Sequence, residues 1–74
     1  QGALVPGETG LEAVPVVARA AMARLAPGGA LLVEIGWKQG PEAAAILAEA
    51  GFADVAVRRD LAGLDRVVEG RKPA

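Results

Sequence analysis

Apolar residues recur at helical spacing in two segments of the chain. The spacing predicts a first helix over about residues 11–26 and a second that begins near Pro41 and ends at Gly51. Thr9 and Glu12 have capping-box spacing ahead of the first helix, and Pro15 lies early enough to be tolerated. The apolar positions are Leu11, Val14, Ala18, Ala21, Met22 and Leu25 in the first helix, and Ala43, Ile46, Leu47 and Ala50 in the second.

The end of the second helix has a recognisable cap. Glycine directly after the last apolar position predicts that Gly51 adopts a left-handed conformation. Phe52 then falls where a Schellman motif places a hydrophobic contact, back onto Leu47.

Three further segments have the patterns of strands. Residues 30–36 form an apolar run broken only by Glu34, which is typical of a strand covered on both faces. Residues 54–59 alternate, with Val55 and Val57 on one side, and predict a half-buried strand. Residues 60–65 contain Gly63 and predict a loop, so residues 66–70 return as a short antiparallel strand.

The expected fold is α/β, in the order helix, strand, helix, strand, strand. The strand–helix–strand unit should form a right-handed crossover with parallel strands. Residues 1–10 contain three glycines and a proline and predict a loop that leads into the first helix. Residues 71–74 are expected to be a frayed tail.

The composition predicts one unit that is incomplete by itself. The chain has 74 residues and is 53% hydrophobic, which is more apolar surface than so short a chain easily buries. Both faces of the strand at 30–36 are largely apolar, so each face needs cover from another part of the protein. We therefore expect self-association or contact with the rest of a longer protein, and the absence of an initiator methionine agrees with a fragment.

Charge and residue types argue against several function classes. The net charge is -1 with interspersed signs, so no basic stripe indicates a nucleic-acid partner. Histidine and cysteine are both absent, which removes the commonest general base and the commonest metal ligands. No apolar run has the length of a membrane span, and a cytoplasmic protein without a metal site is expected.

Several motifs together resemble one enzyme family. The segment LAPGGALLVEIG is similar to the one that leads into the fifth strand of class I methyltransferases. In this order and spacing, GETGLEAV, EIGWKQG, AGFADV and RRDLAGLDRVVEGR resemble the C-terminal part of the protein-(glutamine-N5) methyltransferases of the HemK/PrmC type. The resemblance covers nearly the whole chain.

This resemblance implies a fold and a parent activity. It implies the C-terminal portion of a Rossmann-like sheet, with the last strand antiparallel and inserted between the other two, and both helices on one face. The same layout implies that the other face and the outer edge of the strand at 30–36 are uncovered in this chain, because the parent covers them with upstream elements. The parent enzyme would use S-adenosylmethionine to methylate the glutamine side-chain amide of peptide chain release factors. The family's glycine-rich cofactor loop and its Asn-Pro-Pro-Tyr motif are absent from this sequence, so no catalytic or cofactor-binding residue is expected here.

Three residues after or within the strand at 30–36 are candidates for the border of a cleft. Glu34 lies near the carboxyl end of that strand, where α/β sheets bind ligands, and Trp37 and Gln39 follow it. Each also has a structural interpretation: Glu34 held by backbone donors or an arginine, Trp37 covering a core edge, and Gln39 capping the next helix.

The arginines near the C-terminus have mainly structural interpretations. Arg66 beside Asp60 and Asp65 predicts a loop-closing ion pair, with a substrate contact as the alternative. Arg58 and Arg59 are expected to be solvated surface, with a release-factor contact as the alternative.

Three functions stay open at this stage. The chain is expected to be the structural C-terminal part of a release factor glutamine methyltransferase and to be inactive alone. The alternatives are a non-catalytic, self-associating α/β module and a methyltransferase for another substrate.

Overall fold

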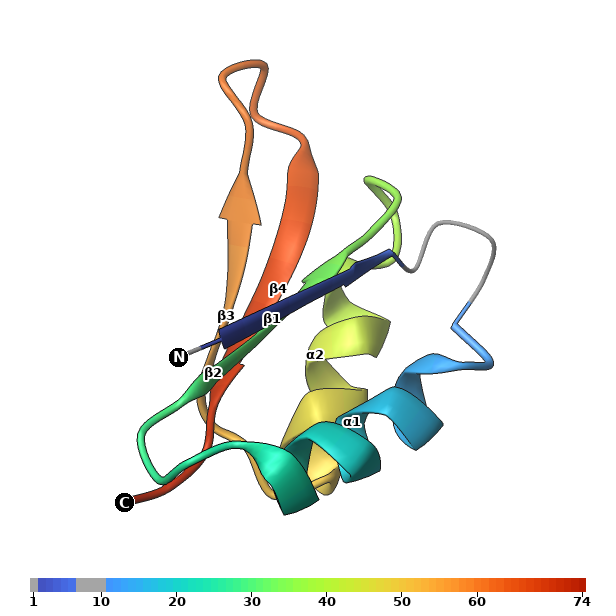
Figure 1. Cartoon of the computed structure of the whole chain (residues 1–74). Coiled ribbons are helices and arrows are strands. Elements are labelled where there is room, and N and C mark those ends of the chain that lie inside the picture. The colour runs from blue at the N-terminus through green and yellow to red at the C-terminus, as the bar shows by residue number, and fades with distance from the viewer. Residues whose placement is uncertain (1, 7–10) are drawn as a thin grey trace.

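The computed structural model describes residues 2–6 and 11–74, and the side chains of residues 11–74. Within these residues the chain forms one sheet with two helices packed against it (Figure 1). The elements are β1 (Gly2–Pro6), α1 (Val14–Arg24), β2 (Ala30–Glu34), α2 (Gly40–Glu49), β3 (Ala53–Arg59) and β4 (Asp65–Arg71).

The strand order confirms the expected insertion of the last strand. The described strands lie in the order β1-β2-β4-β3, so β4 separates β2 from β3. β1 pairs parallel with β2, whereas β4 pairs antiparallel with both β2 and β3. The chain therefore has the predicted helix–strand–helix–strand–strand order, preceded by one strand that the sequence patterns did not predict.

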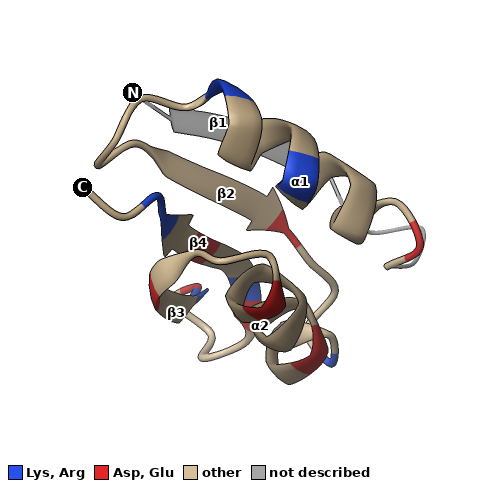
Figure 2. Ribbon diagram, turned by 90° about the horizontal axis from the view of Figure 1, so that it is seen from below, with Lys and Arg blue, Asp and Glu red and all other residues tan. Residues whose placement is uncertain are grey.

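Both helices lie on one face of the sheet, as expected. The β1–α1–β2 and β2–α2–β3 connections step across the sheet in the same direction between parallel strands. Right-handed crossovers that step in one direction put their helices on the same face. Figure 2 shows the two helices together in front of the sheet, and they contact each other.

One hydrophobic core lies between this helical layer and the sheet. Leu31 and Val33 of β2 and Val68 of β4 are fully buried, and the sheet register places Val33 beside Val68. Ala18 of α1 and Leu47 of α2 are also fully buried and belong to the same cluster. The core cluster consists of alanine and branched aliphatic side chains, with Phe52 as its aromatic member.

The leading segment differs from the sequence-based expectation. Residues 1–10 were predicted to be a loop, but Gly2–Pro6 is a strand whose register pairs Gly2 with Ala30 and Pro6 with Glu34. The prediction that the outer edge of the strand at 30–36 is unpaired is wrong for the same reason. Glycine and proline are uncommon inside strands, so the three glycines and the proline of this segment predicted a loop instead.

The first helix is shorter than predicted at both ends. It spans Val14–Arg24, so Pro15 lies in its first turn, where a missing backbone N–H costs nothing. Ala13 occupies the N-cap position without a side-chain cap, and the predicted capping role of Thr9 lies outside the described residues.

The cap of the second helix is confirmed. Gly51 has φ 101°, and its N–H donates to the carbonyl of Ala48 at 3.1 Å. The Phe52 N–H donates to the carbonyl of Leu47, also at 3.1 Å, which completes a Schellman motif. Phe52 and Leu47 are both buried in the core cluster, as the motif predicts.

A β-bulge keeps the valines of β3 on the helical face. The register pairs Ala53 with Arg71 and Ala56 with Glu69, so β3 carries one residue more than β4 in between. Asp54, with φ 53°, is the residue with left-handed backbone in this bulge. Val55 therefore packs against the core, and Val57 pairs with Val68, in agreement with the predicted alternation.

The C-terminal tail is held in place rather than frayed at its start. Arg71 belongs to β4, and Lys72 exchanges backbone hydrogen bonds with Gly28 and Gly29 at 2.8 Å. The Lys72 Nζ donates to the carbonyl of Leu25 at 2.8 Å and so neutralises part of the C-terminal end of α1. The prediction of a frayed tail over residues 71–74 is thus wrong for its first two residues.

Candidate functional site

An open hollow lies at the carboxyl end of β2. It has a volume of about 230 Å³ and is lined by Glu34, Ile35, Gly36, Arg66 and Val67. Antiparallel pairing creates it, because the register places Glu34 opposite Val67 and the Ile35 N–H donates to the carbonyl of Arg66 at 2.9 Å. Open α/β sheets bind ligands beyond the carboxyl ends of their parallel strands, so this is the end at which a site is expected.

The structure brings only one of the three predicted cleft residues into this hollow. Glu34 is exposed there, and its carboxylate has no ion pair among the described residues. Trp37 is 55% exposed and contacts Lys38, whose Nζ lies 4.6 Å from the ring centroid, instead of covering a core edge. Both Trp37 and Gln39 lie outside the lining of the hollow.

Gln39 has a structural role in the loop between β2 and α2. It occupies the N-cap position of α2, but its side chain does not cap the helix. Instead, Gln39 Oε1 accepts a hydrogen bond from the Gly36 N–H at 2.8 Å, while the Gln39 N–H donates to the carbonyl of Gly36. This closed turn fixes the path of the chain where β2 leaves the sheet.

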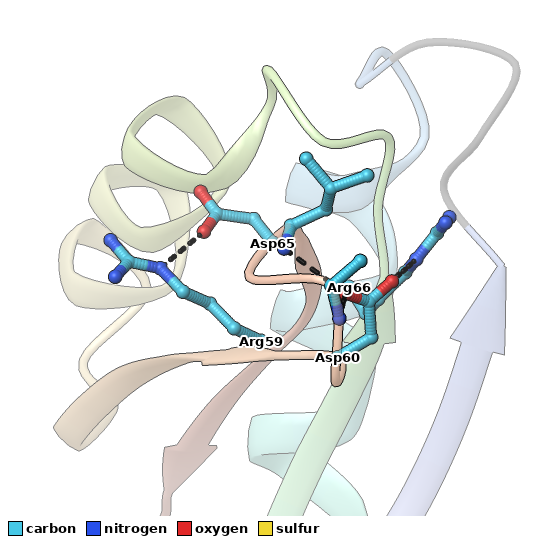
Figure 3. A network of polar contacts seen from close by, with 6 residues as sticks. Arg59, Asp60, Asp65 and Arg66 are labelled. Carbon is cyan, nitrogen blue, oxygen red and sulfur yellow. Dashed lines mark hydrogen bonds and ion pairs between the residues drawn. The ribbon is translucent and has the colours of Figure 1, made fainter.

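The loop between β3 and β4 is organised around one carboxylate. Asp60 Oδ1 accepts hydrogen bonds from the N–H groups of Ala62 and Leu64, at 2.9 and 3.0 Å. Asp60 Oδ2 accepts from Arg66 Nε at 2.8 Å, and Figure 3 shows this pair beside the Arg59–Asp65 pair. The predicted clamp between Arg66 and Asp60 is confirmed, whereas Asp65 pairs with Arg59 at 3.1 Å.

A second ion cluster lies on the face of the sheet that the helices leave open. Glu69 is only 8% exposed, and its Oε1 lies 2.7 Å from both Nε and Nη2 of Arg58. Arg71 Nη2 approaches the other oxygen at 3.3 Å. Arg58 and Arg59 were predicted to be solvated surface; their side chains are largely exposed, but both are paired.

The Arg66 contact stabilises the charged form of the Asp60 carboxyl group. Its guanidinium donates to the Asp60 carboxylate and holds the pKa of that group below its ordinary value, and the Leu64 N–H acts in the same direction. Because the folded-state pKa is the lower one, this stabilisation is present above the unfolded pKa. It is lost as the pH falls through the folded-state pKa.

We expect Arg66→Gln to raise the pKa of Asp60 toward its ordinary value, because the strongest influence on that pKa is removed. An NMR titration of the side-chain carboxyl carbon measures it directly. Arg59→Gln is the matched control, since Arg59 pairs with Asp65 and should leave the pKa of Asp60 in place. Equal pKa values of Asp60 in the wild type and in Arg66→Gln would contradict this assignment.

The loop after β2 does not fit a site for the cofactor implied by the resemblance. The Gly36 N–H at the end of β2 is already bonded to Gln39, and the first residue of α2, Gly40, lies against the Asp65 carboxylate. An added Cβ on Gly40 would lie 2.5 Å from Asp65 Oδ2, so the Asp65 side chain packs directly against the first residue of this helix. Among the described residues no cluster of acidic, histidine or cysteine side chains could hold a metal ion.

The sequence patterns missed most of the hollow. Arg66 was assigned to the loop clamp, with a substrate contact as the alternative, and Val67 fell inside the predicted strand at 66–70 without a role at a site. Both line the hollow beside Glu34. Their position follows from the pairing of β4 with β2, which no local pattern encodes.

Neither helix of the described residues has the length and apolar character of a membrane span.

Comparison with known proteins identifies the relatives of this chain. No protein-family model matches it. It is 51% identical over 72 residues to the release factor glutamine methyltransferase of Cereibacter sphaeroides and 46% identical over 70 residues to that of Bordetella pertussis. The similarity covers 97% and 95% of this chain but 26% of each relative, in the C-terminal region. The chain is therefore related, along nearly its whole length, to the C-terminal region of the release factor glutamine methyltransferases.

Proposed function

We propose that this chain is the C-terminal structural part of an S-adenosylmethionine-dependent methyltransferase that modifies the glutamine side-chain amide of peptide chain release factors. The observation that carries the proposal is the 51% sequence identity with such an enzyme, which extends over 97% of the chain. The insertion of β4 between β2 and β3 agrees with the expected parent sheet. Because the chain spans about a quarter of the length of the relatives it matches, the activity is assigned to a longer protein.

Within that protein the segment has two roles. Its sheet and its helices extend the parent fold, and the hollow beside Glu34 and Arg66 borders the substrate side of the cleft. Trp37, exposed on the loop after β2, is a further candidate for this border, whereas the bond from Gly36 to Gln39 favours a structural role for Gln39. A release factor as the substrate implies that the enzyme acts in the cytoplasm.

The test is an assay of the full-length protein that contains this segment. With S-adenosylmethionine and a release factor, we expect mass spectrometry to find one added methyl group on a glutamine side chain. A protein that methylates another substrate but no release factor would support the alternative of a different methyltransferase. A protein without any methyl transfer would leave the non-catalytic module as the better interpretation.

The isolated chain is expected to be inactive. The family's cofactor loop and Asn-Pro-Pro-Tyr motif are absent from the sequence, and the loop after β2 does not fit the cofactor. Calorimetric titration of the chain with S-adenosylmethionine should therefore give no saturable heat. Saturable binding at micromolar concentration would contradict this prediction.

The isolated chain is also expected to self-associate. Leu32 and Val67 are only half-buried on the helix-free face, and β3 forms one edge of the sheet with Val57 36% exposed. An uncovered face and a free edge both favour association, and the small sheet has little other support. Sedimentation velocity at several concentrations should show a rising average mass. A monomer that keeps its amide protection at high concentration would refute the prediction.

A further inference from the structure

The loop between β3 and β4 presents an apolar surface on a rigid support. Leu61 at its tip is fully exposed, and Leu64 is 38% exposed. The N–H groups of Ala62, Gly63 and Leu64 all donate to Asp60, through its side chain or its carbonyl. The Asp60 N–H in turn donates to the carbonyl of Leu64 at 2.9 Å. The tip therefore has little conformational freedom left to lose on binding.

The charges at the base of this loop are paired with each other. Arg59 pairs with Asp65, and Arg66 pairs with Asp60, so two cations and two anions cancel (Figure 3). A partner that covers the tip would meet leucine side chains without having to strip water from an unpaired charge of these four residues. Such a neutral apolar tip suits contact with an apolar patch on a folded protein.

The tip lies at the end of the sheet where a substrate is expected. β3 runs parallel to β2, because both pair antiparallel with β4. The loop after β3 therefore projects beyond the same carboxyl end as the hollow after β2, and Figure 1 shows the hairpin reaching past the helices. Arg66 joins the two features, since it holds the loop through Asp60 and also lines the hollow.

We propose that the hairpin tip, residues 61–64, is a docking element for the protein that carries the target glutamine. This inference rests on the proposed function, which makes the substrate a folded protein rather than a free amino acid. Leu61 enters an apolar depression on that protein, and Leu64 packs at its rim. The contact lies outside the chemistry, so it adds to substrate affinity without affecting the transfer of the methyl group.

The test uses a full-length enzyme. In the Cereibacter sphaeroides methyltransferase, this chain replaces the matched segment of 72 residues, and the release factor is the substrate. We expect Leu61→Ser to raise KM for the release factor about fivefold with kcat unchanged, as for removal of a side chain that contributes to binding alone. Leu61→Met should keep KM close to that of the unsubstituted chimaera. Val16→Ser is the matched control and should leave KM unchanged. Val16 is an exposed apolar residue like Leu61, with 59% exposure, but it lies on α1, which packs over β2 and not beside the β3–β4 loop.

The outcomes separate this inference from the proposed function. A chimaera without methyl transfer to the release factor contradicts the proposed function itself. An active chimaera in which Leu61→Ser leaves KM unchanged, or lowers kcat alone, overturns the docking role. A lower melting temperature of Leu61→Ser would mean that the tip packs against another part of the enzyme. A changed sedimentation coefficient would mean that it contacts a second copy; either result also overturns the inference.

Discussion

Gly70→Ala is expected to destabilise the fold strongly, although it adds one methyl group. Gly70 is buried in β4, and an added Cβ would lie 2.9 Å from the Cβ of Phe52 and 3.1 Å from Cδ2 of Leu47. Both neighbours are held by the Schellman motif at the end of α2, so neither can retreat freely. Overpacking of this kind costs about 1–3 kcal/mol, and Gly70→Val, with two more methyl groups, should cost more.

Urea unfolding followed by circular dichroism at one fixed protein concentration measures this loss. Gly36→Ala is a suitable control, because a Cβ there would lie 3.4 Å from the nearest atom, Gln39 Oε1, and Gly36 does not have a positive φ. We expect the free energy of unfolding to fall far less for Gly36→Ala than for Gly70→Ala. Equal losses in the two variants would mean that α2 can move away from β4 at little cost.

The elements with strong local patterns were predicted well from the sequence. Helical spacing identified both helices, and the glycine after the second one identified its left-handed cap, confirmed by φ 101° at Gly51. These features depend on residues close in sequence, so a single chain reveals them. The insertion of β4 between β2 and β3 came from the family resemblance, because no local pattern specifies which strands become neighbours.

The features that depend on strand pairing escaped the sequence patterns. β1 is defined by its pairing with β2, and the bulge at Asp54 by the mismatch between β3 and β4. Arg58 and Glu69 are eleven residues apart, and they meet only because this register places them on one face. The same holds for the candidate site: Glu34 was predicted from its place at the end of a strand, but Arg66 and Val67 join it through β4.

Leu47→Ala should also cause a large loss of stability. Leu47 is fully buried between α2 and the sheet, and its truncation leaves a cavity in the core. Substitutions of this type cost about 2–5 kcal/mol, which approaches the whole stability of a small domain. Urea unfolding measures it, with the exposed Ala45→Ser on the same helix as a control that should change little.

Combining this substitution with Gly70→Ala tests whether the two residues share one space. Leu47 Cδ2 is one of the atoms that a Cβ added at Gly70 would meet, so Leu47→Ala removes part of the overlap as well as the packing. The double variant should therefore be more stable than the sum of the two losses predicts, by about 0.5–3 kcal/mol. Val14→Ala, a buried valine on α1, should instead combine additively with Gly70→Ala. Additive losses for Leu47→Ala and Gly70→Ala would mean that Phe52 alone, whose Cβ lies closest, limits the size of the side chain at this position.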